Sequence, residues 1–120
     1  MFIPKEIDLI IYQGATFRKA WDIVDKQSGS PVDLTGYTAR MHIRGKIKDE
    51  LPVVVLTTTN GGISIMITES QTVLSLFISA EVTAALTISK GVYDLEIVDT
   101  SGEVYRLVQG QVTISKEVTR

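Results

Sequence analysis

Three residues give this chain its best case for catalysis: His42, Asp94 and Glu96. His42 is the only histidine, so a Ser-His-Asp triad would depend on it alone. Asp94 and Glu96 stand two residues apart, which puts both carboxylates on one face of a strand, where they could flank a sugar or a calcium ion. No Asp-x-Asp-x-Asp-Gly loop and no glycine-rich phosphate motif accompanies them. We therefore expect solvated surface side chains rather than a small hydrolase: no enzyme activity, no metal and no cofactor.

The composition limits the kinds of partner that the chain can bind. Its 120 residues are 44% hydrophobic and 22% charged, which predicts one folded domain over residues 1–120. The net charge is −2 and the 12 Lys and Arg residues are scattered, so we expect no binding to nucleic acid or to an anionic membrane. There is no cysteine, no basic and apolar stretch typical of a signal peptide, and no apolar run long enough to span a membrane. These features predict a soluble protein and suit folding in a reducing cytoplasm.

The segment 91–114 has the clearest alternation of the chain and predicts a β-hairpin. Its first arm puts Tyr93 and two further apolar residues on one face, and residues 99–102 supply a short turn that ends in glycine. A tyrosine two residues after a glycine, at the start of such a strand, is typical of the tyrosine corner of a β-sandwich. Gly110 interrupts the second arm, which predicts a β-bulge there.

Short alternating segments elsewhere predict further strands, with turn residues between them. Asn60-Gly61-Gly62 is typical of a hairpin turn, and Ser79 can cap a helix of about two turns that ends near Leu86. The predicted fold is therefore all-β: a single immunoglobulin-like antiparallel β-sandwich with about eight strands and one short helical turn. The further strands are expected at residues 7–12, 16–24, 38–44, 53–58, 63–68 and 72–79.

Two groups of exposed side chains point to binding rather than to catalysis. The first group is apolar and falls on outward positions of the predicted strands, which predicts a surface that another subunit covers: Ile10, Met66, Phe77, Val92 and Val98. The second group is aromatic and could stack on a sugar: Tyr12, Tyr37 and Tyr105. The terminal segments 1–6 and 115–120 can also extend and pair with a neighbour's edge strand.

Four stretches of the sequence resemble one known family. The most specific begins with Asp-Leu-Thr-Gly-Tyr, in which the first residue can form an Asx-turn and the glycine allows a tight corner before a strand. The stretches are residues 33–44, 56–63, 93–96 and 117–120. They resemble the small immunoglobulin-like structural proteins that tailed bacteriophages and prophages encode and that are associated with the virion.

This resemblance implies a non-enzymatic assembly or accessory protein, made in the bacterial host cytoplasm and located in the virion. Its place there would be the tail collar, the baseplate or the capsid surface. Its partners would be portal, tail or capsid proteins, with a homo-oligomer or a ring in the particle. The alternative is a carbohydrate-binding or adhesion module. The two hypotheses differ in whether the three exposed tyrosines share a groove.

Overall fold

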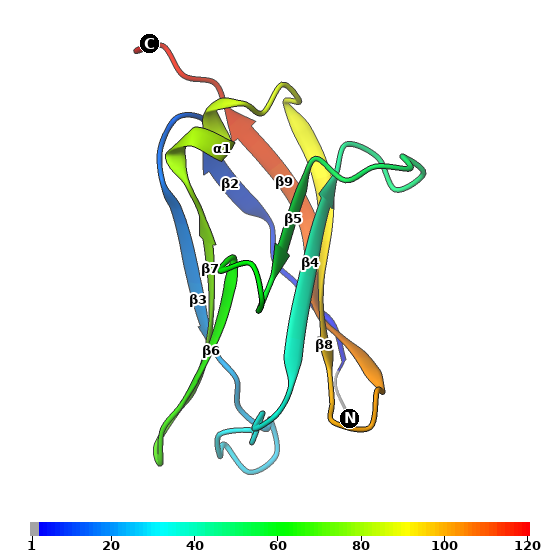
Figure 1. The fold of residues 1–120 in the computed structure, drawn as a ribbon. Coiled ribbons are helices and arrows are strands. Elements are labelled where there is room, and N and C mark those ends of the chain that lie inside the picture. The colour runs from blue at the N-terminus through cyan, green and yellow to red at the C-terminus, as the bar shows by residue number, and fades with distance from the viewer. Residues whose placement is uncertain (1–2) are drawn as a thin grey trace.

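The structure is a computed structural model that describes residues 3–120. The described residues form two sheets that face each other across one apolar core (Figure 1). The larger sheet has the order β1-β9-β8-β4-β5, with β2 also paired to β9, and the smaller has the order β3-β7-β6. The strands of the larger sheet are β1 (Lys5–Glu6), β2 (Leu9–Tyr12), β4 (Thr38–Arg44), β5 (Val54–Thr57), β8 (Lys90–Val98) and β9 (Val104–Ser115). The strands of the smaller sheet are β3 (Phe17–Asp22), β6 (Ile63–Ile67) and β7 (Thr72–Ile78).

Alternation of side chains builds the core, as the sequence predicts. Along β7 and along β8 every second residue is buried, because successive side chains point to opposite faces of a sheet. The helix α1 (Ala80–Ala84) follows β7, and the Ser79 side chain accepts a hydrogen bond of 3.2 Å from the N–H of Val82. The prediction of an all-β immunoglobulin-like sandwich with one short helix is confirmed.

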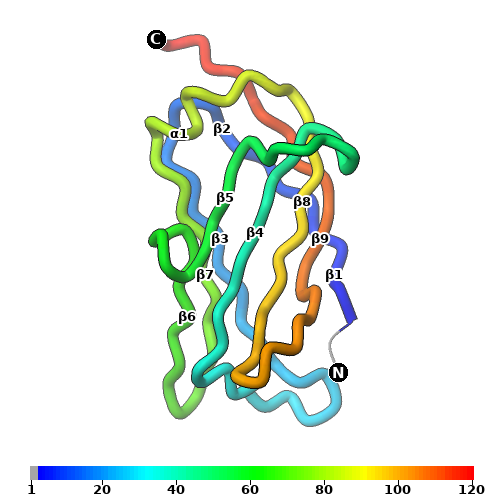
Figure 2. Tube along the Cα trace, turned by 45° about the vertical axis from the view of Figure 1, so that its right-hand side comes forward, coloured from blue at the N-terminus to red at the C-terminus, as the bar shows by residue number. Residues whose placement is uncertain are grey.

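Two details of the predicted topology are wrong. The sandwich is not wholly antiparallel, because β1 and β2 both run parallel to β9, with Glu6 opposite Gln109 and Leu9 opposite Val112. The Asn60 turn also does not close a hairpin: β5 pairs with β4 in the larger sheet, and β6 pairs with β7 in the smaller one. The chain crosses from one sheet to the other at this turn (Figures 1 and 2). The side chain of Asn60 accepts a hydrogen bond from the β5 backbone and donates one to it, at 2.9 and 3.0 Å, which stabilises the crossing.

The predicted bulge at Gly110 lies elsewhere, and the glycine has another role. The register of β9 against β8 shifts beside Leu107, so that Leu107 and Val108 are both buried. Gly110 faces Tyr93 across the hairpin, and a Cβ atom at Gly110 would lie only 2.2 Å from the carbonyl oxygen of Ile7. The glycine therefore makes room for the backbone between β1 and β2 to approach β9.

Tyr93 is also not a local tyrosine corner. Its hydroxyl donates a hydrogen bond of 2.6 Å to the carbonyl of Ile7, at the opposite end of the sequence. The side chain lies opposite Gly110 on the inner face of the sheet, and its hydrogen bond joins β8 to the backbone between β1 and β2. Burial raises the pKa of the Tyr93 phenol, which keeps it protonated as the donor.

The Asp-Leu-Thr-Gly-Tyr corner forms as predicted. Asp33 accepts hydrogen bonds from the N–H and the hydroxyl of Thr35, at 3.0 and 2.6 Å, and Gly36 adopts a φ of 80° that favours glycine. The bond from the Thr35 hydroxyl is the main cause that lowers the pKa of Asp33.

The two terminal segments are partly bound to their own chain. Residues 5–6 pair with β9, and residues 1–2 of the predicted N-terminal extension lie outside the described residues. At the other end, the N–H of Glu117 donates to the Gln13 side chain at 2.9 Å, and Val118 beyond it is 90% exposed. No helix within residues 3–120 has the length and apolar character needed to cross a membrane.

Candidate functional site

The outer face of the six-stranded sheet gathers the residues that could do chemistry. In the register of β4 against β8, His42 lies opposite Asp94 and Arg40 lies opposite Glu96. On the other side of β8, Arg106 lies opposite Glu96. These side chains point outward because their neighbours along each strand are buried in the core. The sheet therefore brings together three residues that the sequence singled out for chemistry.

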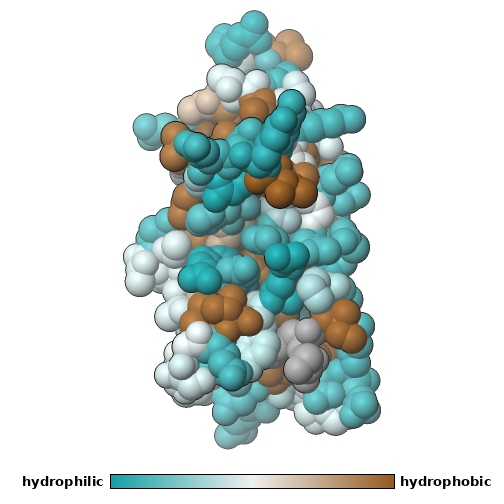
Figure 3. All heavy atoms as spheres, turned by 90° about the vertical axis from the view of Figure 1, so that its right-hand side faces the viewer, coloured by the Kyte–Doolittle hydropathy of each residue, from teal (hydrophilic) through white to brown (hydrophobic). Residues whose placement is uncertain are grey.

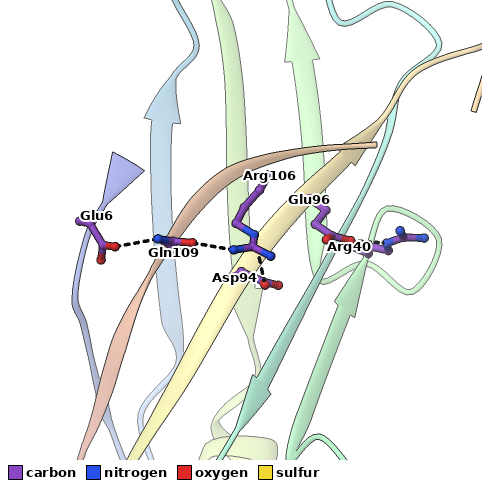
Figure 4. A network of polar contacts seen from close by, with 6 residues as sticks. All are labelled: Glu6, Arg40, Asp94, Glu96, Arg106 and Gln109. Carbon is purple, nitrogen blue, oxygen red and sulfur yellow. Dashed lines mark hydrogen bonds and ion pairs between the residues drawn. The ribbon is translucent and has the colours of Figure 1, made fainter. Parts of the chain in front are cut away.

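Four of the polar side chains on this face form a continuous chain of contacts (Figure 4). Gln109 donates to a Glu6 carboxylate oxygen at 2.7 Å and accepts a hydrogen bond from Arg106 at 3.0 Å. Nε of Arg106 lies 3.5 Å from Oδ2 of Asp94. The chain of contacts thus links β1, β9 and β8 on the solvent side.

A second ion pair lies beside this chain of contacts. Nε of Arg40 is 2.9 Å from Oε1 of Glu96, and the two side chains are 49% and 27% exposed. An arginine therefore contacts each of the two carboxylates that could serve as acid, base or nucleophile. Such exposed pairs contribute little to stability, but they fix the direction of each side chain.

His42 is engaged as well. The guanidinium of Arg44 lies 3.2 Å from Nδ1 of His42 and donates to the carbonyls of Asp49 and Glu50 at 2.8 and 2.9 Å. Since a guanidinium can only donate, Nδ1 of His42 accepts and the ring proton lies on Nε2. Arg44 thus holds the connection after β4 against this face.

Most of these polar side chains, but not Arg40, line an open depression with a volume of about 630 Å³. Figure 3 shows that the face around it is mainly hydrophilic, with apolar atoms in separate spots. Among residues 3–120 no three His, Asp or Glu side chains lie close enough to hold a metal ion. The lining residues are Glu6, His42, Arg44, Ile47, Val92, Tyr93, Asp94, Glu96, Arg106, Gln109, Gly110 and Gln111.

The five predicted interface residues point outward as expected, but they do not form one patch. Ile10, Val92 and Val98 lie on the larger sheet, whereas Met66 and Phe77 lie on the smaller one. Val92 and Val98 are six residues apart on β8, a separation of about 20 Å. A sandwich has two outer faces, so outward alternation alone does not make residues neighbours.

On the outer face of the smaller sheet, Arg18 partly covers the ring of Phe77. The guanidinium of Arg18 lies 4.8 Å from the centre of the Phe77 ring, across the β3–β7 pair. Met66 on the next strand is 64% exposed. The outer face of this sheet therefore combines a cation with small and apolar side chains.

The three predicted stacking tyrosines lie at opposite ends of the sandwich. Tyr12 pairs with Ser115 at the end of β9, about 33 Å along that strand from Tyr105. Tyr37 is close enough to Tyr105 to contribute to the raised pKa of Tyr105, and both rings pack against the core. The Tyr105 hydroxyl donates to Glu103 at 2.7 Å, and this bond is the main cause that raises the pKa of Tyr105 to about 12. The tyrosines therefore do not form one stacking platform.

Sequence reasoning missed Arg106, Gln109 and Glu6, which complete the polar face. A strict alternation along β9 puts Arg106 and Gln109 on opposite faces, because they are three residues apart. The bulge at Leu107 returns them to the same face. Only the pairing of β1 with β9 then places Glu6 beside Gln109.

Comparison with known proteins gave no match by sequence and a distant likeness by structure. No protein-family model matches this sequence, and no curated protein matches it. One solved structure that resembles it is a point mutant of the SrpA adhesin from Streptococcus sanguinis, with a TM-score of 0.47 and 11% sequence identity. The match covers 91% of this chain and 55% of the adhesin chain, so the chain spans about half the length of that structure. A likeness this distant carries no argument about function.

Proposed function

We propose that this chain is a non-enzymatic binding module that acts through protein–protein contact as a structural or accessory part of a phage particle. The proposal rests on the contacts that arginines make with the acidic and histidine side chains on the outer face of the larger sheet. Arginines there contact both Asp94 and Glu96, and His42 accepts from Arg44. An arginine thus contacts each of these three side chains, and a preorganised charged face suits recognition of a complementary surface.

The place in the particle rests on the resemblance of residues 33–44 and three further stretches to phage structural proteins. A tail collar, a baseplate or the capsid surface would each supply portal, tail or capsid proteins as partners. Such assemblies repeat by symmetry, which favours a homo-oligomer or a ring. Localisation in the virion and synthesis in the host cytoplasm belong to the same proposal.

Quantitative mass spectrometry of purified particles tests this role. We expect the chain at a fixed ratio to the portal or the capsid protein. Arg106→Glu reverses a charge in the centre of the polar face and should lower incorporation. Lys26→Glu makes the same charge change on the exposed loop after β3 and should leave incorporation unchanged. Absence of the chain from particles would refute the structural role.

A second candidate is a carbohydrate-binding or adhesion module. The depression on the larger sheet favours it, because amide, carboxylate and guanidinium groups are those that hydrogen-bond to sugar hydroxyls. A glycan array followed by calorimetry tests it. Binding that Arg106→Glu abolishes would support this candidate, and an array without any bound glycan would exclude it for the glycans tested.

A further inference from the structure

The strand β3 leaves one side of its backbone unpaired. Within residues 3–120, β7 is the only strand that pairs with β3, so β3 is an edge strand of the smaller sheet (Figure 1). The N–H of Ile23 donates to the carbonyl of Thr72 at 2.8 Å, so the backbone groups of Ile23 and of every second residue before it point toward β7. The backbone groups of Arg18, Ala20 and Asp22 therefore point away from β7, and all three residues are exposed.

This edge is open because of the way the N-terminal strands pair. In an immunoglobulin constant-type sandwich the first strand lies beside the second. Here β1 and β2 instead join β9 on the larger sheet, where Gly110 and Tyr93 hold the Ile7 backbone. The edge strand of the larger sheet, β5, is covered instead: the Asn60 side chain bonds to its outward N–H and C=O groups.

We propose that β3 pairs with β3 of a second copy of this chain, antiparallel, about a two-fold axis through Ala20. In this register Arg18 meets Asp22 of the second copy, and Ala20 meets its own equivalent. In both pairs the backbone N–H and C=O groups point away from β7, so the two residues of each pair can form N–H···O bonds in both directions. The two smaller sheets then become one continuous sheet.

The charges of β3 favour this register over the registers centred on Lys19 and on Arg18. On the outer face, each Arg18 meets an Asp22, and the pair occurs twice by symmetry. A shift of the axis to Lys19 opposes two ammonium groups, and a shift to Arg18 opposes two guanidinium groups. On the inner face, the preferred register places each Lys19 beside a Trp21 ring, a favourable cation–π arrangement. Ala20 at the centre keeps the two backbones free of bulky side chains.

The side chains involved are available for this contact. Arg18 lies over the Phe77 ring, which orients its guanidinium but leaves the N–H edge free to meet a carboxylate. Asp22 has one long contact of 3.4 Å, from the Gln71 amide. The net charge of −2 adds little repulsion between two copies. The inference deepens the proposed function, on which it rests for its biological role, by naming a second copy as the partner.

Sedimentation velocity over a range of concentrations tests the pairing on the full chain. We expect a reversible dimer for the native sequence. Asp22→Arg opposes two arginines at both symmetric positions and should weaken the dimer about tenfold or more. The double variant Arg18→Asp with Asp22→Arg restores opposite charges and should bring the dissociation constant back to within about threefold of the native value. Glu69→Arg makes the same charge change in the exposed turn after β6 and should leave the dimer unchanged.

Circular dichroism confirms that each variant is folded, and recovery in the double variant separates a lost contact from a lost fold. A native chain that stays monomeric at every concentration would overturn the pairing. So would a dimer that Asp22→Arg does not weaken. A monomer that is still incorporated into particles would refute this inference and leave the proposed function standing. A dimer of this register that is absent from particles would refute the proposed function and leave the pairing standing.

Discussion

Replacing Gly110 by alanine tests how β9 accepts the N-terminal strand. A Cβ atom at Gly110 would lie 2.2 Å from the Ile7 carbonyl oxygen and 2.8 Å from its carbon, both inside the 3.0 Å that real Cβ contacts respect. Because both atoms belong to the backbone, the segment between β1 and β2 must move by about 1 Å. The φ of Gly110 lies outside the left-handed region, so the clash is the only obstacle to alanine there.

The two possible outcomes differ in sign. Without a clash, Gly110→Ala would stabilise the protein by about 0.4–1 kcal/mol, because alanine reduces the conformational entropy of the unfolded chain. Overpacking instead costs about 1–3 kcal/mol. Stretching the 2.6 Å bond from Tyr93 to Ile7 costs about 1 kcal/mol more. We therefore expect a net loss of about 2 kcal/mol in the free energy of unfolding.

Urea unfolding, followed by the fluorescence of Trp21, measures this free energy. Trp21 is the only tryptophan and packs half-buried against the core. Gly45→Ala is the matched control, because its φ also lies outside the left-handed region and its nearest contact, at 3.0 Å, is the flexible carboxylate of Asp49. The control should change stability by less than about 1 kcal/mol. A Gly110→Ala protein as stable as the native one would refute the close approach of Ile7.

A double-mutant cycle then tests whether Gly110 and Tyr93 act on the same carbonyl. Tyr93→Phe leaves the carbonyl of Ile7 without its donor and should cost about 1–3 kcal/mol. In the Gly110→Ala background the same substitution should cost less, because the bond is already stretched. Strictly additive costs would contradict this coupling.

Three smaller changes test other parts of the structure. Asn60→Ala removes the side chain that bonds to the outward N–H and C=O groups of β5. We expect a loss of about 1 kcal/mol in urea unfolding and faster aggregation by light scattering. Unchanged values for both would show that the protein does not need these two bonds. Ser79→Ala removes the acceptor for Val82 N–H and should cost about 0.5–2 kcal/mol in the same unfolding assay, whereas no loss would exclude a capping role. The pKa of Tyr105 is about 12 in the folded chain and 10.0 ordinarily, so the folded state binds more protons than the unfolded state between these pH values. The free energy of unfolding should therefore fall as the pH rises through this window, and it should fall less steeply in Glu103→Gln. NMR of the tyrosine ring and unfolding at each pH measure the two effects.

Local patterns predicted the strands well where each strand has one buried face. The alternation from Thr38 to Arg44 gave β4 with both of its ends, and the Asp33 turn before it formed with the expected hydrogen bonds. The N-cap at Ser79 was likewise predicted from its own neighbourhood. In each case the physical cause lies within a few residues of the feature, which is the range that a sequence pattern reports.

Features that depend on pairing between distant strands were not predictable in this way. Asn60 is typical of a hairpin turn, yet its turn leads from one sheet to the other, because turn chemistry does not decide which strand the next segment pairs with. Val92, Val98 and Phe77 were each correctly placed on an outer face, but only the strand order decides which face. The same gap explains why Arg106 was missed: the bulge beside it changes the phase of alternation.

The pairing of β1 and β2 with β9 has two consequences that no local pattern indicates. It brings Glu6 to Gln109 and so extends the polar row on the larger sheet. It also withdraws the first strand from the smaller sheet and leaves the edge of β3 open. Both follow from the Ile7 backbone, which can lie against β9 only where Gly110 has no side chain and where Tyr93 supplies a donor. The charged face and the open edge, the two surfaces on which binding is proposed, therefore share one structural cause.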